Sequence, residues 1–278
     1  MSRTWLITGC STGFGHLLAQ HAFSIGDSVV ATARSLQSLY DLGRDDEDRM
    51  LRIPLDVSAK ETIEQVVEKA LEKFGRIDVL VNNAGYGYFA TQEEGEQEEV
   101  RTMFDTNVFG LIAVTQKVLP HMRERRQGVI INISSVAGRI ATPRSGFYQA
   151  SKWAVEALSE SLYMEVSSFG IRVIVIEPGA YDTDFSTRSA RSGAREDDPD
   201  SPYAALRELW KNNAREKIFP YRQDPTEVIE GLMEALESKL PFVRLPIGRD
   251  ASTLLHRRDE MKTAEFVEWM RKIYHGES

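Results

Sequence analysis

Seven short apolar runs alternate with longer helical patterns, and this alternation constrains the fold more than any other feature of the sequence. Most of the runs lack the polar alternation of half-exposed strands; they occupy Thr4–Thr8, Ser28–Ala33, Met50–Leu55, Asp78–Val81, Val129–Ser134, Arg172–Ile176 and Phe242–Pro246. Helical patterns lie near residues 14–25, 60–74, 97–122, 147–168 and 225–238. Continuous apolar strands separated by helices are typical of a parallel sheet that is buried on both faces. We therefore predict an α/β fold with a doubly wound parallel sheet of about seven strands and helices on both faces.

One segment departs from this rhythm. From about residue 180 to residue 221 the chain is polar, charged and proline-containing at first, and an amphipathic piece follows around Tyr203–Trp210. Long insertions after the carboxyl end of a strand are often lids over a site or disordered loops. We interpret residues 1–278 as one domain in which this segment is a substrate lid. A further helix is predicted over Met261–Ile273, with its apolar face packed in the core or against another subunit.

Composition and charge exclude several classes of protein. The net charge of −8 disfavours binding to nucleic acid, whose phosphates the overall field would repel. The single cysteine, Cys10, permits neither an internal disulfide nor a zinc ribbon, and we predict no metal site. No apolar run approaches the length of a membrane span, and no signal-peptide core follows the N-terminus. The expectation is a cytoplasmic protein.

A glycine-rich turn joins the first strand to the first helix. The segment that begins at Thr8 reads Gly9, Cys10, Ser11, Thr12, Gly13, Phe14 and Gly15. Glycines allow a sharp turn and a close approach of the backbone to a pyrophosphate, and the following helix N-terminus offers free N–H groups and a positive dipole end. The strand before and the helix after the turn favour a dinucleotide site over a purely structural turn.

The end of the second strand bears on the choice of cofactor. A dinucleotide fold usually carries an acidic residue there to bind the adenosine ribose, but this strand ends in Ala33 and Arg34. Arginine can clamp a 2′-phosphate that a carboxylate would repel, so we predict a preference for NADP(H), with NAD(H) possible. After the third strand, Asp56 and Val57 are candidates for contacts with the adenine. Asp56 is alternatively part of the N-cap region of the helix that begins near Ser58.

Three side chains form a candidate reacting centre. Ser135 follows the fifth strand, and Tyr148 and Lys152 are four residues apart on a predicted helix, so their side chains share one face. A free tyrosine has a pKa near 10 and is a poor base at neutral pH. A neighbouring ammonium favours the phenolate, and we expect Lys152 to lower the pKa of Tyr148 by two or three units, which costs about 1.4 kcal/mol per unit.

The order and spacing of these motifs resemble the short-chain dehydrogenase/reductase family. The residues that carry the resemblance are Thr8–Gly15, Asn82, Asn83, Ala84, Gly85, Asn107, Ser135, Tyr148, Lys152, Pro178 and Gly179. The resemblance covers about residues 3–248 and implies a Rossmann-type fold. The N-terminal half is similar to the hydroxysteroid and retinol dehydrogenase branch.

The resemblance also implies roles for individual residues. Tyr148 would be the general acid in carbonyl reduction and the general base in alcohol oxidation, and Lys152 would tune it and bind the nicotinamide ribose. Ser135 would donate to the substrate oxygen, and Asn107 would hold a water that relays protons. The segments expected against the cofactor are Asn82–Gly85, Pro178–Gly179 and Thr183, with Thr183 at the nicotinamide carboxamide.

The substrate is predicted to be a small lipophilic ketone or secondary alcohol. Aromatic and aliphatic residues either line its pocket or pack on the scaffold: Tyr86, Tyr88, Phe89, Tyr181, Phe185, Tyr203, Leu206, Leu209 and Trp210. The resemblance also implies a homodimer or homotetramer formed through the helices near 97–122 and 147–169. Other interpretations remain open: a non-catalytic NADP-binding regulator, an NAD-preferring alcohol dehydrogenase, or an epimerase or dehydratase of the extended branch, which the glycine spacing fits poorly.

Overall fold

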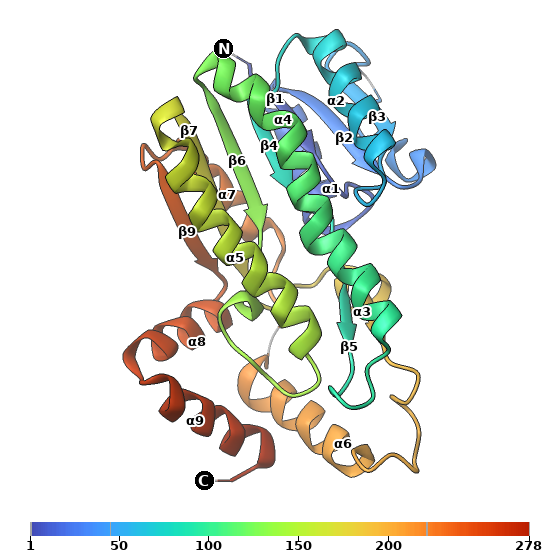
Figure 1. The fold of residues 1–278 in the computed structure, drawn as a ribbon, viewed down its shortest axis with the longest axis vertical. Coiled ribbons are helices and arrows are strands. Elements are labelled where there is room, and N and C mark those ends of the chain that lie inside the picture. Colours follow the sequence, from blue (N-terminus) through green and yellow to red (C-terminus); the bar gives the residue numbers. More distant parts are fainter. Residues whose placement is uncertain (1, 45, 221, 278) are drawn as a thin grey trace.

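The computed structural model, which describes residues 2–44, 46–220 and 222–277, contains one sheet of seven parallel strands (Figure 1). The strand order is β3-β2-β1-β4-β6-β7-β9. The strands are β1 (Thr4–Ile7), β2 (Ser28–Ala33), β3 (Met50–Pro54), β4 (Val79–Asn82), β6 (Gly128–Ile133), β7 (Ile171–Pro178) and β9 (Phe242–Ile247). The order reverses between β1 and β4, which places a crevice at the carboxyl ends of these two strands.

Helices cover both faces of the sheet, as predicted. The helices α1 (Gly13–Ser24) and α7 (Thr226–Glu237) bury side chains such as Leu18 and Leu232 against one face. The other face packs against α2 (Lys60–Phe74), α4 (Leu111–Arg125) and α5 (Gly146–Val166). Most strand residues are buried, so the continuous apolar runs reflect burial on both faces.

The predicted long helix near 97–122 is three elements. α3 (Gln97–Phe104) passes into a π-helical turn, η2 (Asp105–Gly110), and then into α4. Such π-turns are rare and occur frequently at functional sites. This one contains Asn107, which the sequence had indicated as a site residue.

A layer of chain lies beyond the carboxyl ends of the strands (Figure 1). It contains α6 (Ala204–Asn213), α8 (Arg249–Glu260), α9 (Thr263–His275), and two short strands, β5 (Gly87–Phe89) and β8 (Ala190–Ser192), which pair in parallel. The amphipathic piece around Tyr203–Trp210 is α6, and the helix predicted over Met261–Ile273 is α9. The helix α8 and the small sheet were not predicted. Short helical turns complete the chain: η1 (Leu36–Leu39), η3 (Val136–Gly138), η4 (Ser167–Phe169), η5 (Phe185–Ser189) and η6 (Ala214–Ile218).

The structure also bears on membranes and metals. None of the helices in the described ranges is both long and apolar enough to cross a lipid bilayer. Within those ranges, no group of three or more His, Cys, Asp and Glu side chains is placed to hold a metal ion.

Candidate active site

A cavity of about 520 Å³ lies at the carboxyl ends of the central strands. Its size falls within the usual range for small-molecule and cofactor sites. Of the residues that the sequence indicated, the cavity is lined by Gly9, Ser11, Thr12, Gly13, Phe14, Arg34, Asp56, Val57, Asn83, Ala84, Gly85, Ser135, Tyr148, Lys152, Pro178, Gly179 and Thr183. Gly15, Asn82 and Asn107, which were also expected at the site, do not line the cavity. Gly15 and Asn107 contact residues that do.

The glycine turn needs its glycines for two different reasons. Gly9 and Gly13 have positive φ angles of 75° and 60°, a backbone conformation that residues with a Cβ rarely adopt. Gly15 is required for space, because a Cβ there would come within 2.4 Å of Asn83 Nδ2 and 2.5 Å of the Gly9 carbonyl oxygen. The first turn of α1 is thereby packed tightly against the end of β4, and the N-terminus of α1 faces the cavity.

Thr8 and Asn83 hold the turn to β4. Thr8 Oγ1 accepts hydrogen bonds of 3.0 Å from the backbone N–H groups of Asn83 and Ala84. The Asn83 side chain donates in return to the carbonyl oxygens of Thr8 and Gly9, at 2.9 and 3.0 Å. Asn82 instead braces the sheet, since its amide donates to Thr115 and Asn132. Of residues 82–85, which were expected against the cofactor, Asn83, Ala84 and Gly85 therefore line the cavity, and Asn82 does not.

Arg34 and Asp56 lie at the far end of the cavity from Tyr148. Arg34 is exposed and makes no hydrogen bond or ion pair within the part of the chain that the structure describes, although its charge reaches Asp56. Asp56 accepts hydrogen bonds from the N–H and hydroxyl of Ser58, which hold the pKa of its carboxyl below the usual value. The two interpretations of Asp56 are therefore compatible, because it organises the turn before α2 and also lines the cavity.

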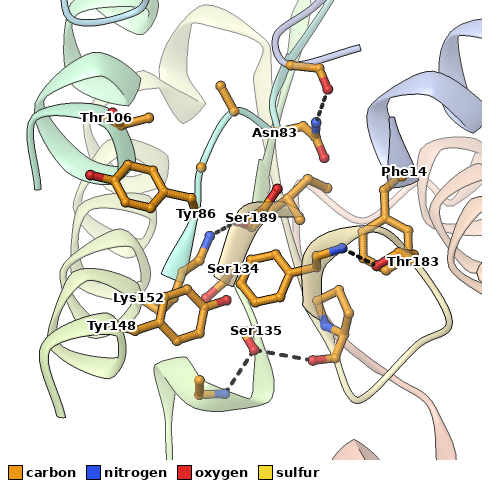
Figure 2. Close-up of a pocket in the computed structure, with 18 of the residues that line it drawn as sticks. Phe14, Asn83, Tyr86, Thr106, Ser134, Ser135, Tyr148, Lys152, Thr183 and Ser189 are labelled. Carbon is orange, nitrogen blue, oxygen red and sulfur yellow. Dashed lines mark hydrogen bonds between the residues drawn. The ribbon is translucent and has the colours of Figure 1, made fainter. Parts of the chain in front are cut away.

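Tyr148, Lys152 and Ser135 converge on the near end of the cavity (Figure 2). Tyr148 and Lys152 project from the same face of α5, and Lys152 Nζ lies 5.9 Å from the centre of the Tyr148 ring. The ammonium donates a 2.8 Å hydrogen bond to the carbonyl oxygen of Ile133, at the end of β6. Ser135 Oγ accepts from Ala137 N at 3.1 Å and donates to the Pro178 carbonyl at 3.4 Å. These bonds fix the serine and lysine at opposite sides of the phenol.

The expected direction of the Tyr148 pKa is wrong for the chain by itself. Burial raises the pKa of Tyr148 to about 12, and the neighbouring Ser135 hydroxyl opposes this only in part. Burial also lowers the pKa of Lys152 to about 8, although the negative charge of Glu156 favours the ammonium and partly opposes this shift. The phenol is desolvated among protein atoms, which disfavours its charged form, and the Lys152 ammonium donates its hydrogen bond to the Ile133 carbonyl.

Asn107 lies beneath the cavity rather than in it. Its side-chain amide donates to the Tyr86 carbonyl at 2.8 Å and to Ser151 Oγ at 3.0 Å, and its oxygen accepts from Tyr86 N at 3.0 Å. These contacts join the π-helical turn to the start of β5 and to α5. The geometry gives Asn107 a bracing position, and its role in a proton relay stays a prediction.

The segment after β7 crosses over the cavity. Thr183 Cβ comes within 3.8 Å of the place that a Cβ on Gly13 would occupy, so this segment reaches the glycine turn. Its hydroxyl accepts a 3.3 Å hydrogen bond from Phe185 N. Further along, β8 pairs with β5, with Arg191 opposite Tyr88. Residues 183–192 thus form a strap from one side of the crevice to the other. Tyr221, at the end of the expected lid, lies outside the described residues.

The aromatic residues considered for the substrate pocket fall into two groups. Tyr86, Phe89, Tyr181 and Phe185 line the cavity. The ring of Tyr148 lies between those of Phe89 and Phe185, at centroid distances of 5.7 and 5.6 Å. The remainder pack elsewhere on the scaffold or lie at its surface: Tyr88, Tyr203, Leu206, Leu209 and Trp210.

Several lining residues were not anticipated from the sequence. Ile140, Thr142, Ser145 and Gln149 border the substrate end, and Thr106 borders the cofactor end. Gln149 is adjacent to Tyr148, and it exchanges hydrogen bonds with Thr142. No local motif marks these residues, because their place at the cavity depends on how η2, α5 and the loop before α5 pack in the folded chain.

This set of residues fits a nicotinamide dinucleotide. The glycine turn and helix N-terminus suit a pyrophosphate, and Arg34, which has no ion-pair partner among the described residues, suits an anionic group at one end of the cavity. A buried phenol, a buried ammonium and a half-buried hydroxyl suit proton transfer at the other end of the cavity.

Comparison with known proteins agrees with this geometry. The family model described as short chain dehydrogenase matches residues 3–193. The chain is 41% identical to a 3-ketodihydrosphingosine reductase from Bacteroides thetaiotaomicron, over 98% of this chain and 97% of that protein. It is 34% identical to retinol dehydrogenase 7 from Mus musculus, over 88% of this chain and 80% of that protein.

Solved structures resemble the whole fold. A short-chain dehydrogenase from Streptomyces avermitilis superposes with a TM-score of 0.85 at 36% identity, over 97% of this chain and 96% of that one. An alcohol dehydrogenase from Thermococcus sibiricus, complexed with 5-hydroxy-NADP, has a TM-score of 0.72 at 26% identity, over 88% and 96%. A 3-ketoacyl-(acyl-carrier-protein) reductase from Brucella melitensis, complexed with NADH, has a TM-score of 0.75 at 26% identity, over 90% and 98%. The chain therefore belongs to the short-chain dehydrogenase/reductase family and is an NAD(P)-dependent oxidoreductase.

Proposed function

We propose that the protein transfers a hydride between NADP(H) and a lipophilic ketone or secondary alcohol, with Tyr148 as the proton donor or acceptor. The observation that carries this proposal is the convergence of Tyr148, Lys152 and Ser135 on one cavity that also contains the glycine turn. Residues 2–277 act in this proposal as a single domain, with the 180–220 segment as its lid.

Each of the three side chains has a task that its position supports. When bound, the nicotinamide supplies or accepts the hydride. Ser135 is held at the substrate side of the phenol and donates a hydrogen bond to the substrate oxygen. Lys152 lines the cavity beside Gly85, and its ammonium would bind a ribose hydroxyl of the cofactor there. Tyr148 gives its proton to the oxygen of a ketone as the carbon is reduced.

In the free chain, Tyr148 is in the protonation state that carbonyl reduction requires. With its pKa raised to about 12, Tyr148 is protonated throughout the neutral range and is ready to act as an acid. Alcohol oxidation needs the phenolate, so its rate should rise with pH while the rate of reduction does not.

The preference for NADP(H) rests on Ala33 and Arg34. No carboxylate stands at the end of β2, and Arg34 has no ion-pair partner among the described residues. The structures of similar proteins contain either NADP or NADH, so Arg34 is the feature that favours the phosphorylated cofactor.

The aromatic walls support a lipophilic substrate. Phe89 and Phe185 flank the Tyr148 ring, and Ile140 borders the same end of the cavity. The two relatives described above are named for a ketone and for an alcohol.

We also propose an oligomer formed through α4 and α5. The apolar side chains of Trp153 and Met164 on α5 are exposed, which supports this proposal. A cytoplasmic location likewise remains a prediction.

Substitution of Tyr148 tests the function. Tyr148→Phe keeps the ring packing but removes the proton, so turnover should fall by at least about 100-fold while NADPH binding is retained. NADPH absorbance with a panel of ketones and secondary alcohols measures turnover, and cofactor fluorescence measures binding. Tyr163→Phe, on the same helix α5, is the matched control and should leave turnover unchanged.

Two outcomes would overturn the proposal. Substantial turnover by Tyr148→Phe would remove the phenol from the mechanism. Tight NADPH binding without turnover of any compound by the unmodified protein would favour the non-catalytic regulator instead.

A further inference from the structure

A cluster of buried charges lies directly behind the reacting centre and has no part in the mechanism above. Glu156 lies on α5, one helical turn after Lys152, and Glu177 lies near the end of β7. Glu177 is completely buried and Glu156 is 6% exposed. Arg244 Nε, on β9, lies 3.0 Å from Glu156 Oε2 and 3.6 Å from Glu177 Oε1, so both carboxyl groups meet the same guanidinium nitrogen. The two carboxyl groups are also within hydrogen-bonding reach of each other.

The carboxyl oxygens of this cluster are poorly satisfied. Both oxygens of Glu177 and Oε1 of Glu156 are buried without a hydrogen bond within the described residues. The nearest cations to Glu177, Arg139 and Arg244, remain at 3.6 Å, which is an ion-pair distance but not a hydrogen bond. A fully buried carboxylate without hydrogen-bond donors is costly, and two adjacent ones are more costly still.

A single proton removes most of this cost. Placed between the two carboxyl groups, it converts one acceptor into a donor and removes the repulsion between two negative charges. The electrostatics agree with the geometry. Burial first, and then the charge of Glu156, raise the pKa of Glu177 to about 7. Burial also raises the pKa of Glu156, and the Ser134 hydroxyl and the charge of Arg244 oppose this rise only in part.

The pair is close enough to act on Lys152. Residues four apart on a helix are neighbours on one face, and Glu156 attracts the Lys152 ammonium and so opposes the loss of its proton. Lys152 itself bonds only to a backbone carbonyl, so its charge has no hydrogen-bonded carboxylate partner in the described chain. The residues that face the pair come from several elements: Lys152 and Glu160 on α5, Ser134 after β6, Arg139 after η3, Arg244 on β9 and Asp259 on α8.

We propose that Glu156 and Glu177 share one proton, and that this pair is a positioning group that keeps Lys152 charged and so sets the upper pH limit of turnover. The effect on turnover rests on the proposed function, whereas the shared proton and the charge of Lys152 do not. Two charges one helical turn apart interact strongly enough to shift a titration by about one to two pH units.

The first experiment looks for the proton itself. Infrared difference spectra of the protein without substrate, between about pH 5.5 and about pH 8.5, should show a protonated carboxyl band that disappears as the pH rises. The band should be absent in Glu177→Gln and should titrate at lower pH in Glu156→Gln. The matched control is Glu160→Gln, which removes a half-exposed carboxylate that also contacts Arg244, and it should leave the band unchanged.

The second experiment follows Lys152 directly. In protein labelled with ¹³C-lysine, the Lys152 resonance is assigned by its loss in Lys152→Met, and its titration is followed by NMR. Glu156→Gln should lower the titration midpoint of Lys152 by at least about one pH unit. Glu177→Gln should lower it by less, because Glu156 is the carboxyl group that acts directly on Lys152. Glu160→Gln should change it little. In active protein, the upper-pH limb of kcat should move with the NMR midpoint in each variant.

The outcomes separate this proposal from the proposed function. A wild-type protein without the titrating band, or a Lys152 midpoint that is the same in wild type and in folded Glu156→Gln, would overturn the inference whether or not the protein turns over a ketone. Absence of turnover together with both spectroscopic results would refute the proposed function alone.

Discussion

Burial has opposite effects on the two titratable side chains that α5 brings to the cavity. It keeps the Tyr148 phenol protonated and brings the pKa of Lys152 down to about 8. Spacing in the sequence was sufficient to place both residues on one face of a helix. It could not predict the direction of the phenol pKa, because desolvation depends on the rings of Phe89 and Phe185, which come from distant segments.

At the same scale, Arg34 is expected to decide between the two cofactors. Arg34→Ala should raise the KM for NADPH by about 10–100-fold, the loss of a charge-assisted contact of about 1.5–3 kcal/mol, and should change the KM for NADH by less than about twofold. Initial rates with each cofactor measure both constants. Arg44→Ala, in the same stretch after β2, removes only an exposed contact to the Tyr40 carbonyl and serves as the control. An equal loss with both cofactors would show that Arg34 does not contact the 2′-phosphate.

At the scale of elements, the seven strands were predictable because most are continuous apolar runs and helical patterns separate them in the sequence. The helix α8 was missed because only Ala251, Leu254 and Leu255 are buried among twelve mostly polar residues. The small sheet was missed because β5 and β8 are three residues each and pair across about a hundred residues of chain. Such pairing is a property of the folded lid and leaves no local pattern.

The attachment of the lid depends on a buried ion pair. Arg207 of α6 lies 2.8 Å from Glu94, and both side chains are 4% exposed. Arg207→Met would leave the Glu94 carboxylate without its buried cation, although the hydroxyls of Ser201 and Thr91 still donate to it, so the cost should be at or below the low end of about 3–5 kcal/mol. We expect faster hydrogen exchange over residues 194–213 and a higher KM for the carbonyl substrate, with exchange in the central strands unchanged.

Arg195→Met is the control for the lid. Arg195 contacts the same carboxylate at 3.4 Å but is 46% exposed, so its loss should have little effect on exchange. Equal effects of the two substitutions, or loss of protection in the sheet as well, would mean that Arg207 does not act as a specific anchor of α6.

At the scale of the whole molecule, the two sheet faces, the lid and the C-terminal helices meet around the reacting centre. Val136 and Ile140, from the loop that follows Ser135, pack in one cluster with Trp210 of α6 and Phe266 of α9. The Asn213 amide on α6 also donates to the carbonyl of Tyr274 on α9 at 3.0 Å. The position of Ser135 therefore depends on α6 and α9, which begin about 70 and about 130 residues after it, and this explains why its motif alone could not define the pocket.

The buried Glu177 links the stability of the whole fold to pH. Its folded-state pKa is raised to about 7, so the folded chain binds a proton that the unfolded chain has already lost above about pH 5. The stability it contributes is present below its unfolded pKa and is lost as the pH rises through the folded value. Glu177→Gln carries no such proton. Relative to this variant, wild type should lose up to about 3 kcal/mol of unfolding free energy between about pH 4.5 and about pH 7.5.

Denaturant unfolding of wild type, Glu177→Gln and Glu160→Gln across this range measures the difference. At the acid end, wild type and Glu177→Gln should have similar stability, because a protonated carboxyl and an amide have the same shape. At the alkaline end Glu177→Gln should be the more stable, and Glu160→Gln should follow wild type, since its carboxyl is 53% exposed. Parallel curves for wild type and Glu177→Gln would mean that Glu177 is ionised throughout, with Arg139 and Arg244 able to hold its full charge inside the fold.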